Sequence, residues 1–310
     1  MRSIPNTTLT VHPLCLGGNV FGWTADEQQS LAVLDRYAQD GGNFIDSADM
    51  YSAWAQGNEG GESERVLGRW MASRGNRDDV VIATKVGKLP RLGGTSAATV
   101  HRAVDESLRR LQTDHIDLYY AHMDDQDTPL EETLGAFDAL VHEGKVRYVA
   151  ASNFSAHRLR ESLEVCQREG LTRYVALQPE YNLMERDYEH GLRELCVEED
   201  IGCFPYYGLA RGFLTGKYRP GAEVDSGRGG QGASYLDGRG EAVLRALDEL
   251  AEAHDTTAAA VSLAWLAAQD TIIAPIASAR TVAQLEDLLP LAELELSAEE
   301  LQRLTAATGV

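Results

Sequence analysis

The chain has 310 residues, of which 44% are hydrophobic and 25% charged, and these values are typical of a globular protein with a sizeable core. The formal net charge of −20 argues against nucleic acid or an anionic membrane as a partner. A local basic cluster can still hold a small anionic ligand, because salt screens distant charges. The first residues lack the basic start and apolar stretch of a signal peptide, and no apolar run is long enough to cross a bilayer. We therefore expect a cytoplasmic protein.

Short apolar runs alternate with helix-like segments along almost the whole chain. The candidate strands are residues 14–16, 43–46, 80–85, 116–122, 146–152, 174–178, 201–205 and 271–276. The candidate helices are residues 24–40, 62–71, 99–111, 129–144, 155–169, 282–289 and 297–308. A capping box over residues 24–27 and Pro129 are the start signals of two of these helices. The alternation predicts an α/β fold, a closed parallel (β/α)8 TIM barrel that forms a single domain over residues 1–310.

Residues 221–240 depart from this alternation because they contain seven glycines, and we expect a long mobile loop there. Residues 227–232 match the GxGxxG pattern of dinucleotide-binding folds. No predicted strand precedes this match and no helix begins directly after it, so its context does not fit the motif. The four cysteines, Cys15, Cys166, Cys196 and Cys203, form no CxxC pair, and we expect reduced buried thiols without a metal site.

Polar side chains stand at the C-terminal ends of five consecutive predicted strands, where catalytic groups of such barrels gather. These residues are Asp46, Lys85, His122, Ser152 with Asn153, and Gln178. Any one of them alone can also be read as an ordinary residue of the barrel rim, and this reading is weaker for Lys85 than for Ser152 or Gln178. Five in succession favour an active site, and a phenol, Tyr51, follows the first of them.

An acid, a phenol, an ammonium and an imidazole together suit proton donation to a carbonyl group. A free tyrosine has a pKa of about 10, and burial raises that value. A positive charge about 4 Å away can lower the pKa of a phenol by up to about three units. We expect Lys85 to act in this way on Tyr51, with Asp46 keeping the lysine protonated. His122 then orients the carbonyl oxygen, and Tyr51 acts as the general acid.

A proton donor aimed at a carbonyl group still needs a hydride, which no side chain can supply, so a nicotinamide cofactor is implied. The chain also resembles the aldo-keto reductase family over nearly its whole length. The resemblance rests on the motifs FIDSADMY, VIATKVG, YYAHMDD, ASNFS, LQPEYN, PYYGLARGFLTGKY and PIASARTVAQLEDLL, which occur in that order.

The resemblance implies a role for each residue that matches a family position. The catalytic tetrad corresponds to Asp46, Tyr51, Lys85 and His122. The residues that hold the nicotinamide amide correspond to Ser152, Asn153 and Gln178, and the aromatic residue that stacks on its ring to Tyr206. The segment over the pyrophosphate contains Leu209, Arg211, Gly212 and Lys217, and the adenosine end corresponds to Ser278, Arg280 and Gln284.

Arg280 favours NADPH over NADH because a guanidinium can pair with a 2′-phosphate, while a solvated charge at a helix start is the alternative. Two family positions differ: Ser278 replaces a common glycine, and Leu288 replaces an asparagine that can bind adenine. The segment at residues 206–209, YYGL, replaces a commoner Tyr-Ser-Pro-Leu, which predicts a nicotinamide pocket of altered shape.

Apolar residues of the loops over this rim are candidates for the substrate site, or else simply pack the loops. They are Phe21, Trp23, Trp54 and Met123. The sequence thus predicts an NADPH-dependent reductase of aldehydes or ketones, reversible in principle. Two alternatives stay open: a nucleotide-sensing binding module similar to potassium channel β subunits, and a lyase that forms a Schiff base on Lys85.

Overall fold

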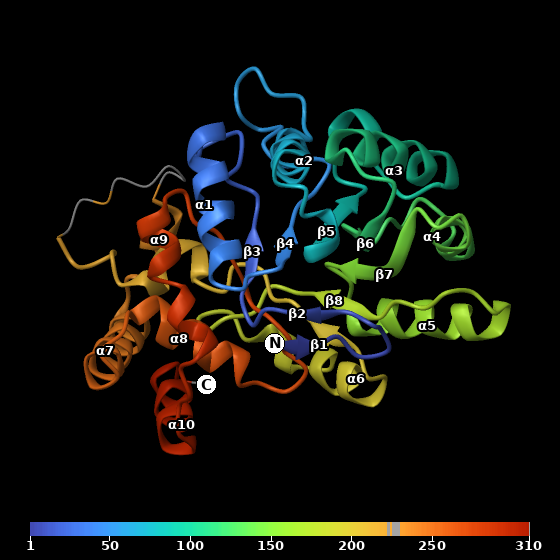
Figure 1. The fold of residues 1–310 in the computed structure, drawn as a ribbon. Coiled ribbons are helices and arrows are strands. Elements are labelled where there is room, and N and C mark those ends of the chain that lie inside the picture. The colour runs from blue at the N-terminus through green and yellow to red at the C-terminus, as the bar shows by residue number, and fades with distance from the viewer. Residues whose placement is uncertain (222–223, 225–229, 310) are drawn as a thin grey trace.

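The computed structural model describes residues 1–221, 224 and 230–309. Eight parallel strands form one curled sheet in the order β10-β3-β4-β5-β6-β7-β8-β9, with helices arranged around its outside (Figure 1). The strands are β3 (Cys15–Gly17), β4 (Phe44–Asp46), β5 (Val81–Val86), β6 (Ile116–Ala121), β7 (Val146–Ser152), β8 (Ala176–Gln178), β9 (Gly202–Cys203) and β10 (Ile276–Ala277). This confirms an α/β architecture with a parallel eight-stranded sheet.

The two edge strands of the sheet are linked by backbone hydrogen bonds outside the regular ladder. The Cys203 N–H donates to the Thr271 carbonyl over 2.8 Å, and the Ile273 N–H donates to the Cys203 carbonyl over 3.0 Å. The Ile276 N–H donates to the Pro205 carbonyl over 2.9 Å. The polar groups of both edges therefore find partners in each other, as buried backbone requires.

Helices surround the outer face of the sheet (Figure 1). They are α1 (Glu27–Gln39), α2 (Glu62–Arg74), α3 (Ala97–Leu111), α4 (Leu130–His142), α5 (Ala156–Glu169), α6 (Leu192–Glu198), α7 (Gly238–Ala253), α8 (Ala258–Ala267), α9 (Val282–Glu286) and α10 (Ala298–Ala307). Some of them pack on other helices, as α10 does on α7. The seven predicted helices are present within a few residues. The start of the first was wrong by two residues, because Asp26 and Gln29 form its capping box.

Three helices were not predicted. Helix α6 is a short element of seven residues, and α7 begins at Gly238, inside the segment that was expected to be a loop. Helix α8 is buried over nine of its ten residues, so it has no polar face and hence no amphipathic period. The predicted glycine-rich loop is also interrupted by a 3-10 helix at Gln231–Tyr235. Residues 222–223 and 225–229, which include the first three positions of the GxGxxG match, lie outside the described residues.

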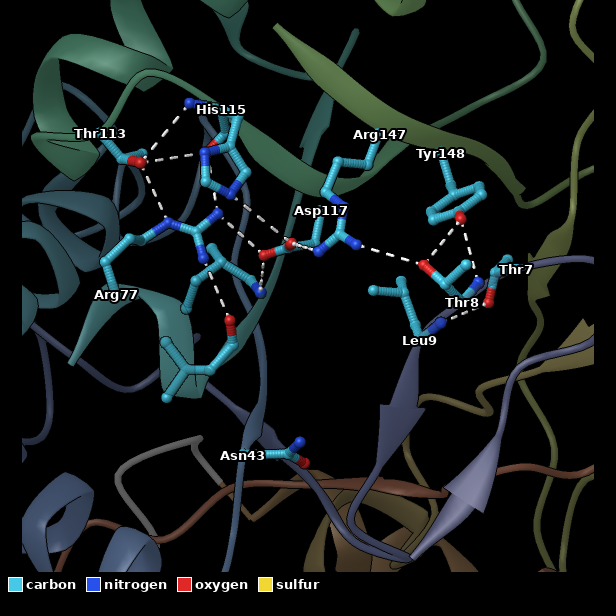
Figure 2. Close-up of polar contacts among 12 residues, drawn as sticks. Thr7, Thr8, Leu9, Asn43, Arg77, Thr113, His115, Asp117, Arg147 and Tyr148 are labelled. Atoms are coloured by element: carbon cyan, nitrogen blue, oxygen red, sulfur yellow. Dashed lines mark hydrogen bonds and ion pairs between the residues drawn. The ribbon is translucent and has the colours of Figure 1, made fainter. Parts of the chain in front are cut away.

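A small antiparallel pair, β1 (Arg2–Ser3) and β2 (Thr10–Val11), lies over the end of the sheet where the parallel strands begin. The Asn43 side chain holds this pair by accepting from the His12 N–H over 2.8 Å and donating to the Thr10 carbonyl over 2.9 Å. The Tyr148 hydroxyl accepts from the Thr8 N–H over 3.0 Å (Figure 2). We call this end the floor of the sheet.

An ion cluster lies beside this pair on the floor. The Asp117 carboxylate is 1% exposed and accepts from the Arg77 guanidinium over 2.8 Å and the Arg147 guanidinium over 2.9 Å (Figure 2). The Ile82 N–H also donates to it over 2.9 Å. Arg147 reaches on to the Thr8 hydroxyl over 3.3 Å, which ties the cluster to the N-terminal pair.

Candidate active site

The opposite end of the sheet, where the parallel strands finish, carries a buried acid, a buried amine and a phenol. Asp46 ends β4, Lys85 is the penultimate residue of β5, and Tyr51 lies in the loop after β4. Lys85 Nζ donates to Asp46 Oδ2 over 2.6 Å, to the Ser47 carbonyl over 2.6 Å and to the Tyr51 hydroxyl oxygen over 2.9 Å. Each of the three N–H bonds of a lysine ammonium thus has an acceptor. Lys85 and Asp46 are 0% and 1% exposed, so their burial is compensated by pairing, as the sequence indicated.

The Tyr51 phenol has two partners in this arrangement. Its hydroxyl oxygen accepts from Lys85 and its O–H donates to Asp46 Oδ2 over 3.0 Å. Burial raises the pKa of Tyr51 well above 10, and the neighbouring Asp46 carboxylate raises it further. The expected depression of this pKa by Lys85 was therefore wrong, because the ammonium 2.9 Å away does not offset burial and Asp46. The phenol holds its proton firmly at neutral pH.

The Lys85 ammonium is subject to the opposite forces. Burial lowers the pKa of Lys85, while its ion pair and hydrogen bond with Asp46 raise it. We take the three acceptors around Nζ as the sign that Asp46 keeps this amine protonated, as expected from the sequence.

His122 follows β6 and lies beside Tyr51, with the two ring centroids 6.3 Å apart. Burial lowers the pKa of His122 well below 6.5, and the positive charges of Lys85 and Lys88 lower it further. The imidazole is therefore neutral at physiological pH and carries one N–H donor. Its Nδ1 atom is buried and has no hydrogen-bond partner among the described residues.

A chain of hydrogen bonds connects this group to the neighbouring strands β7 and β8. The Gln178 amide donates to Asp46 Oδ1 over 2.9 Å, and the Ser152 hydroxyl donates to the Gln178 backbone carbonyl over 2.9 Å. The Asn153 amide donates to the His122 carbonyl over 2.8 Å and to the Ser152 hydroxyl over 3.0 Å. The Tyr206 hydroxyl donates to the Asn153 side-chain oxygen over 2.8 Å. These hydrogen bonds fix the positions of the side chains around Tyr51.

A cavity of about 680 Å³ opens above this network. All the residues predicted for the cofactor line it, together with Tyr51, His122 and Trp54. The predicted cofactor residues among them are Ser152, Asn153, Gln178, Tyr206, Leu209, Arg211, Gly212, Lys217, Ser278, Arg280 and Gln284. Asp46 and Lys85 do not line the cavity, and their burial places them behind Tyr51.

The charge of the cavity wall is opposite to that of the whole chain. Among the described residues four cationic side chains line it, and Asp287 is the single carboxylate. The four cations are Lys88, Arg211, Lys217 and Arg280. In a chain with a net charge of −20, this local excess of positive charge indicates an anionic ligand.

The far end of the cavity is built from β10 and the segment after β9. The Arg280 N–H donates to the Gln284 side chain over 2.9 Å, and the Ser278 hydroxyl donates to the Asn19 side chain over 2.7 Å. A side chain at Gly17 would lie 2.5 Å from the Ser278 hydroxyl, so the backbone approaches this residue closely. The Arg211 guanidinium lies 3.6 Å from Glu180 and over the ring of Tyr207, and its Nε is buried without a hydrogen-bond partner among the described residues.

The predicted substrate residues occupy different places. Trp54 lines the cavity, is 46% exposed and lies with its ring centroid 6.2 Å from that of Tyr51. Trp23 does not line the cavity and packs edge-on against Trp54 at 5.4 Å. Phe21 belongs to the hydrophobic core, and Met123 lies near Gly87, outside the cavity lining.

Sequence reasoning missed two charged residues near the site. Lys88 lines the cavity, and its position just after the apolar strand and TKVG motif could have indicated it. Asp49, which lies between Asp46 and Tyr51 in the sequence, is fully buried in the structure. Burial raises the pKa of Asp49 to about 8, with the Glu64 carboxylate adding to the effect. The sequence around Asp49, Asp-Ser-Ala-Asp at residues 46–49, does not indicate that this carboxyl is buried.

Three further observations concern the cysteines, the helices and the groups that could bind a metal. All four cysteines are free and buried, as expected. No helix within the described ranges is long and apolar enough to span a membrane. The same part of the chain has no cluster of three or more His, Cys, Asp or Glu side chains suited to a metal ion.

Comparison with known proteins assigns the class that this fold and site define. The family model "Aldo/keto reductase family" matches residues 13–308, so the chain belongs to the aldo/keto reductase family and is an NAD(P)H-dependent oxidoreductase. Norsolorinic acid reductase B of Aspergillus parasiticus is 33% identical over 98% of this chain and 82% of its own length. The uncharacterized oxidoreductase YrpG of Bacillus subtilis is 34% identical over 96% of this chain and 92% of its own. Aryl-alcohol dehydrogenase [NADP(+)] of Phanerodontia chrysosporium is 31% identical over 96% and 83%.

Proposed function

We propose that the protein reduces aromatic aldehydes or ketones with NADPH, with Tyr51 as the proton donor. The observation that carries this proposal is the position of the Tyr51 hydroxyl, held by Lys85 and Asp46 at the wall of a positively charged cavity. The relatives named norsolorinic acid reductase and aryl-alcohol dehydrogenase support an aromatic substrate. The same groups serve the reverse oxidation.

The cavity fits a nicotinamide dinucleotide phosphate. Its volume of about 680 Å³ lies in the range of cofactor sites, and its cations Arg211, Lys217 and Arg280 suit phosphate groups. Arg280 would hold the 2′-phosphate, since no hydrogen bond or ion pair engages its guanidinium within the described part of the chain. Ser152 and Asn153 would hold the nicotinamide amide, and Tyr206 would stack on the ring. Gln178 would contribute through its ordered position, because its own amide already donates to Asp46.

A nicotinamide cofactor held in this cavity would supply the hydride that the carbonyl carbon needs. The neutral His122 and Tyr51 direct the carbonyl oxygen by hydrogen bonding. As the C=O π bond breaks, the Tyr51 O–H bond breaks too, and its proton forms the new alcohol O–H. An alkoxide is a stronger base than a phenolate, so the transfer is favourable even from a phenol whose pKa is raised. Lys85 stabilises the phenolate that remains, and a proton from solvent restores it.

The alternative chemistry on Lys85 is disfavoured by the same contacts. A Schiff base requires a free amine, whereas Lys85 Nζ is fully buried and engaged with three acceptors. We further propose that residues 1–310 form a single closed (β/α)8 barrel, supported by the hydrogen bonds between residues 203–205 and 271–276.

The proposal is tested with the purified wild-type chain in two steps. Titration with NADPH and NADH, followed by tryptophan fluorescence, should show saturable binding with a preference for NADPH. NADPH absorbance should then fall when an aromatic aldehyde such as benzaldehyde or veratraldehyde is added. Absence of nucleotide binding, or tight binding without turnover on any carbonyl of an aromatic panel, would contradict the proposal.

A further inference from the structure

Lys88 is a cation at the catalytic end of the cavity, away from the cations proposed for the cofactor. It follows β5 by two residues, whereas Arg280 follows β10, and β3 and β4 lie between these strands in the sheet. Both Lys88 and His122 line the cavity, and the positive charge of Lys88 lowers the pKa of His122. Lys88 therefore lies near the groups that meet the substrate carbonyl.

The turn that carries Lys88 is well anchored. Gly87 has a φ of +120°, a conformation that side-chain-bearing residues rarely adopt, and its carbonyl accepts from the Gly94 N–H over 2.9 Å. The next residue, Leu89, is 1% exposed and packs close to Gly60. The backbone is thus anchored on both sides of Lys88, whose half-buried side chain lines the cavity.

The Lys88 ammonium lacks a partner among the described residues. No hydrogen bond or ion pair connects it to the part of the chain that the structure describes, whereas Lys85 has three acceptors. Partial burial lowers the pKa of Lys88, and the charge of Lys85 lowers it further. A negatively charged ligand group would therefore be stabilised by this half-buried cation.

An aromatic wall completes this end of the cavity. Trp54 is 46% exposed, contacts Tyr51 edge-on and is backed by Trp23. Flat apolar rings with one fixed charged group are the usual means of orienting a small planar ligand. The end of the cavity near the proton donor thus offers an aromatic surface and one unpaired ammonium.

We propose that Lys88 selects aromatic carbonyl substrates that bear an anionic substituent, a carboxylate on the ring being the simplest case. This inference rests on the proposed function and adds the substrate class and a specificity-determining residue. Lys88 takes no part in proton or hydride transfer. It holds the distal carboxylate so that the carbonyl group faces Tyr51 and His122.

The test compares 4-carboxybenzaldehyde with its neutral methyl ester at saturating NADPH, in the wild type and in Lys88→Met, Lys88→Arg and Lys145→Met. In Lys88→Met we expect kcat/KM for the acid to fall about tenfold to a hundredfold, as for the loss of a hydrogen bond to a charged group. The ester should be little affected. Lys88→Arg should retain most of the preference for the acid. Lys145→Met removes the same charge from a surface site paired with Asp105 and Glu143, and should leave the ratio unchanged.

Three outcomes would overturn this inference. Equal loss for both aldehydes in Lys88→Met would show that Lys88 acts through the catalytic groups. An unchanged ratio of acid to ester would show that the ammonium does not meet the substrate. A raised KM for NADPH with unchanged substrate preference would assign Lys88 to the cofactor. If the wild type reduces the ester, the proposed function stands in each of these cases, whereas failure to reduce either aldehyde would count against the function itself.

Discussion

Asp46 and Asp117 are both carboxylates with 1% exposure, yet they lie at opposite ends of the sheet in different surroundings. At the floor, Asp117 is held by two arginines and a backbone N–H, all fixed donors (Figure 2). At the other end, Asp46 shares one oxygen between Lys85 and the hydroxyl of Tyr51, a residue at the cavity wall. The floor cluster ties the N-terminal pair of strands to the sheet. The Asp46 network instead holds the phenolic proton of Tyr51, which we propose is transferred to the substrate.

The largest expected effect is on turnover at the catalytic end. Tyr51→Phe removes the proton donor but keeps the ring, and we expect kcat to fall about a thousandfold, within the usual range for loss of a general acid. NADPH binding, measured by tryptophan fluorescence, should remain close to that of the wild type. Trp54→Phe is the matched control, because it changes a neighbouring aromatic ring without removing a proton donor. Substantial carbonyl reduction by Tyr51→Phe would exclude the phenol as the acid.

The next effect is on stability at the floor. Asp117→Asn leaves Arg77 and Arg147 without their shared carboxylate, and loss of one partner of a buried pair costs about 3 kcal/mol in the free energy of unfolding. Denaturant unfolding measures this loss, while kcat of the folded variant should stay near the wild-type value. Asp114→Asn, at a 95% exposed side chain nearby, should leave stability close to that of the wild type. A large loss of kcat in Asp117→Asn with unchanged stability would contradict the structural role that we give to the floor cluster.

A smaller effect is expected on cofactor choice. Arg280→Met should raise KM for NADPH by about tenfold to a hundredfold, because a charge-assisted hydrogen bond to the 2′-phosphate is lost. KM for NADH should hardly change, since NADH lacks that phosphate. An equal rise in KM for NADPH and NADH would show that Arg280 does not bind the 2′-phosphate.

The last prediction concerns the pH dependence of stability at Asp49, which lies two residues before Tyr51. Burial raises the pKa of Asp49 to about 8, so the folded state holds a proton that the unfolded state releases near pH 4. Stability therefore falls as pH rises from about 4 to about 8, by at most about 1.4 kcal/mol per pH unit from this group. Asp49→Asn removes that contribution, so its stability relative to the wild type should increase with pH across this window.

Denaturant unfolding at several pH values measures the difference between the two proteins. The exposed Asp78→Asn is a control that should show no such trend. If the difference between Asp49→Asn and the wild type is independent of pH, the Asp49 carboxyl is already ionised in the folded state.

Much of the fold followed from sequence because the strands are apolar runs bounded by polar residues, as at Val81–Val86 and Ile116–Ala121. Helix α8 was not predicted because a helix that is buried on all sides has no amphipathic pattern. Strands β1 and β2 were not predicted because two residues are too few to show a pattern. The single-domain assignment remains a prediction.

For the site, chain order placed Asp46, Lys85 and His122 correctly at strand ends, since parallel strands finish at one edge. The direction of the Tyr51 pKa shift was wrong because it depends on the balance between burial, Asp46 and Lys85, which spacing along a sequence does not contain. The substrate roles of Phe21, Trp23, Trp54 and Met123 depend on loop conformation and remain predictions. Of these four, Trp54 alone is among the described residues that line the cavity.

The most direct measurement is a crystal structure of the protein with NADP⁺ and a slowly reacting aromatic ketone. We predict the nicotinamide ring between Tyr206 and the cavity wall, with the ketone oxygen within hydrogen-bond distance of both the Tyr51 hydroxyl and the His122 imidazole. Lys85 should still contact Tyr51. A ketone oxygen bound out of reach of the Tyr51 hydroxyl, with the nicotinamide ordered in the cavity, would contradict the account.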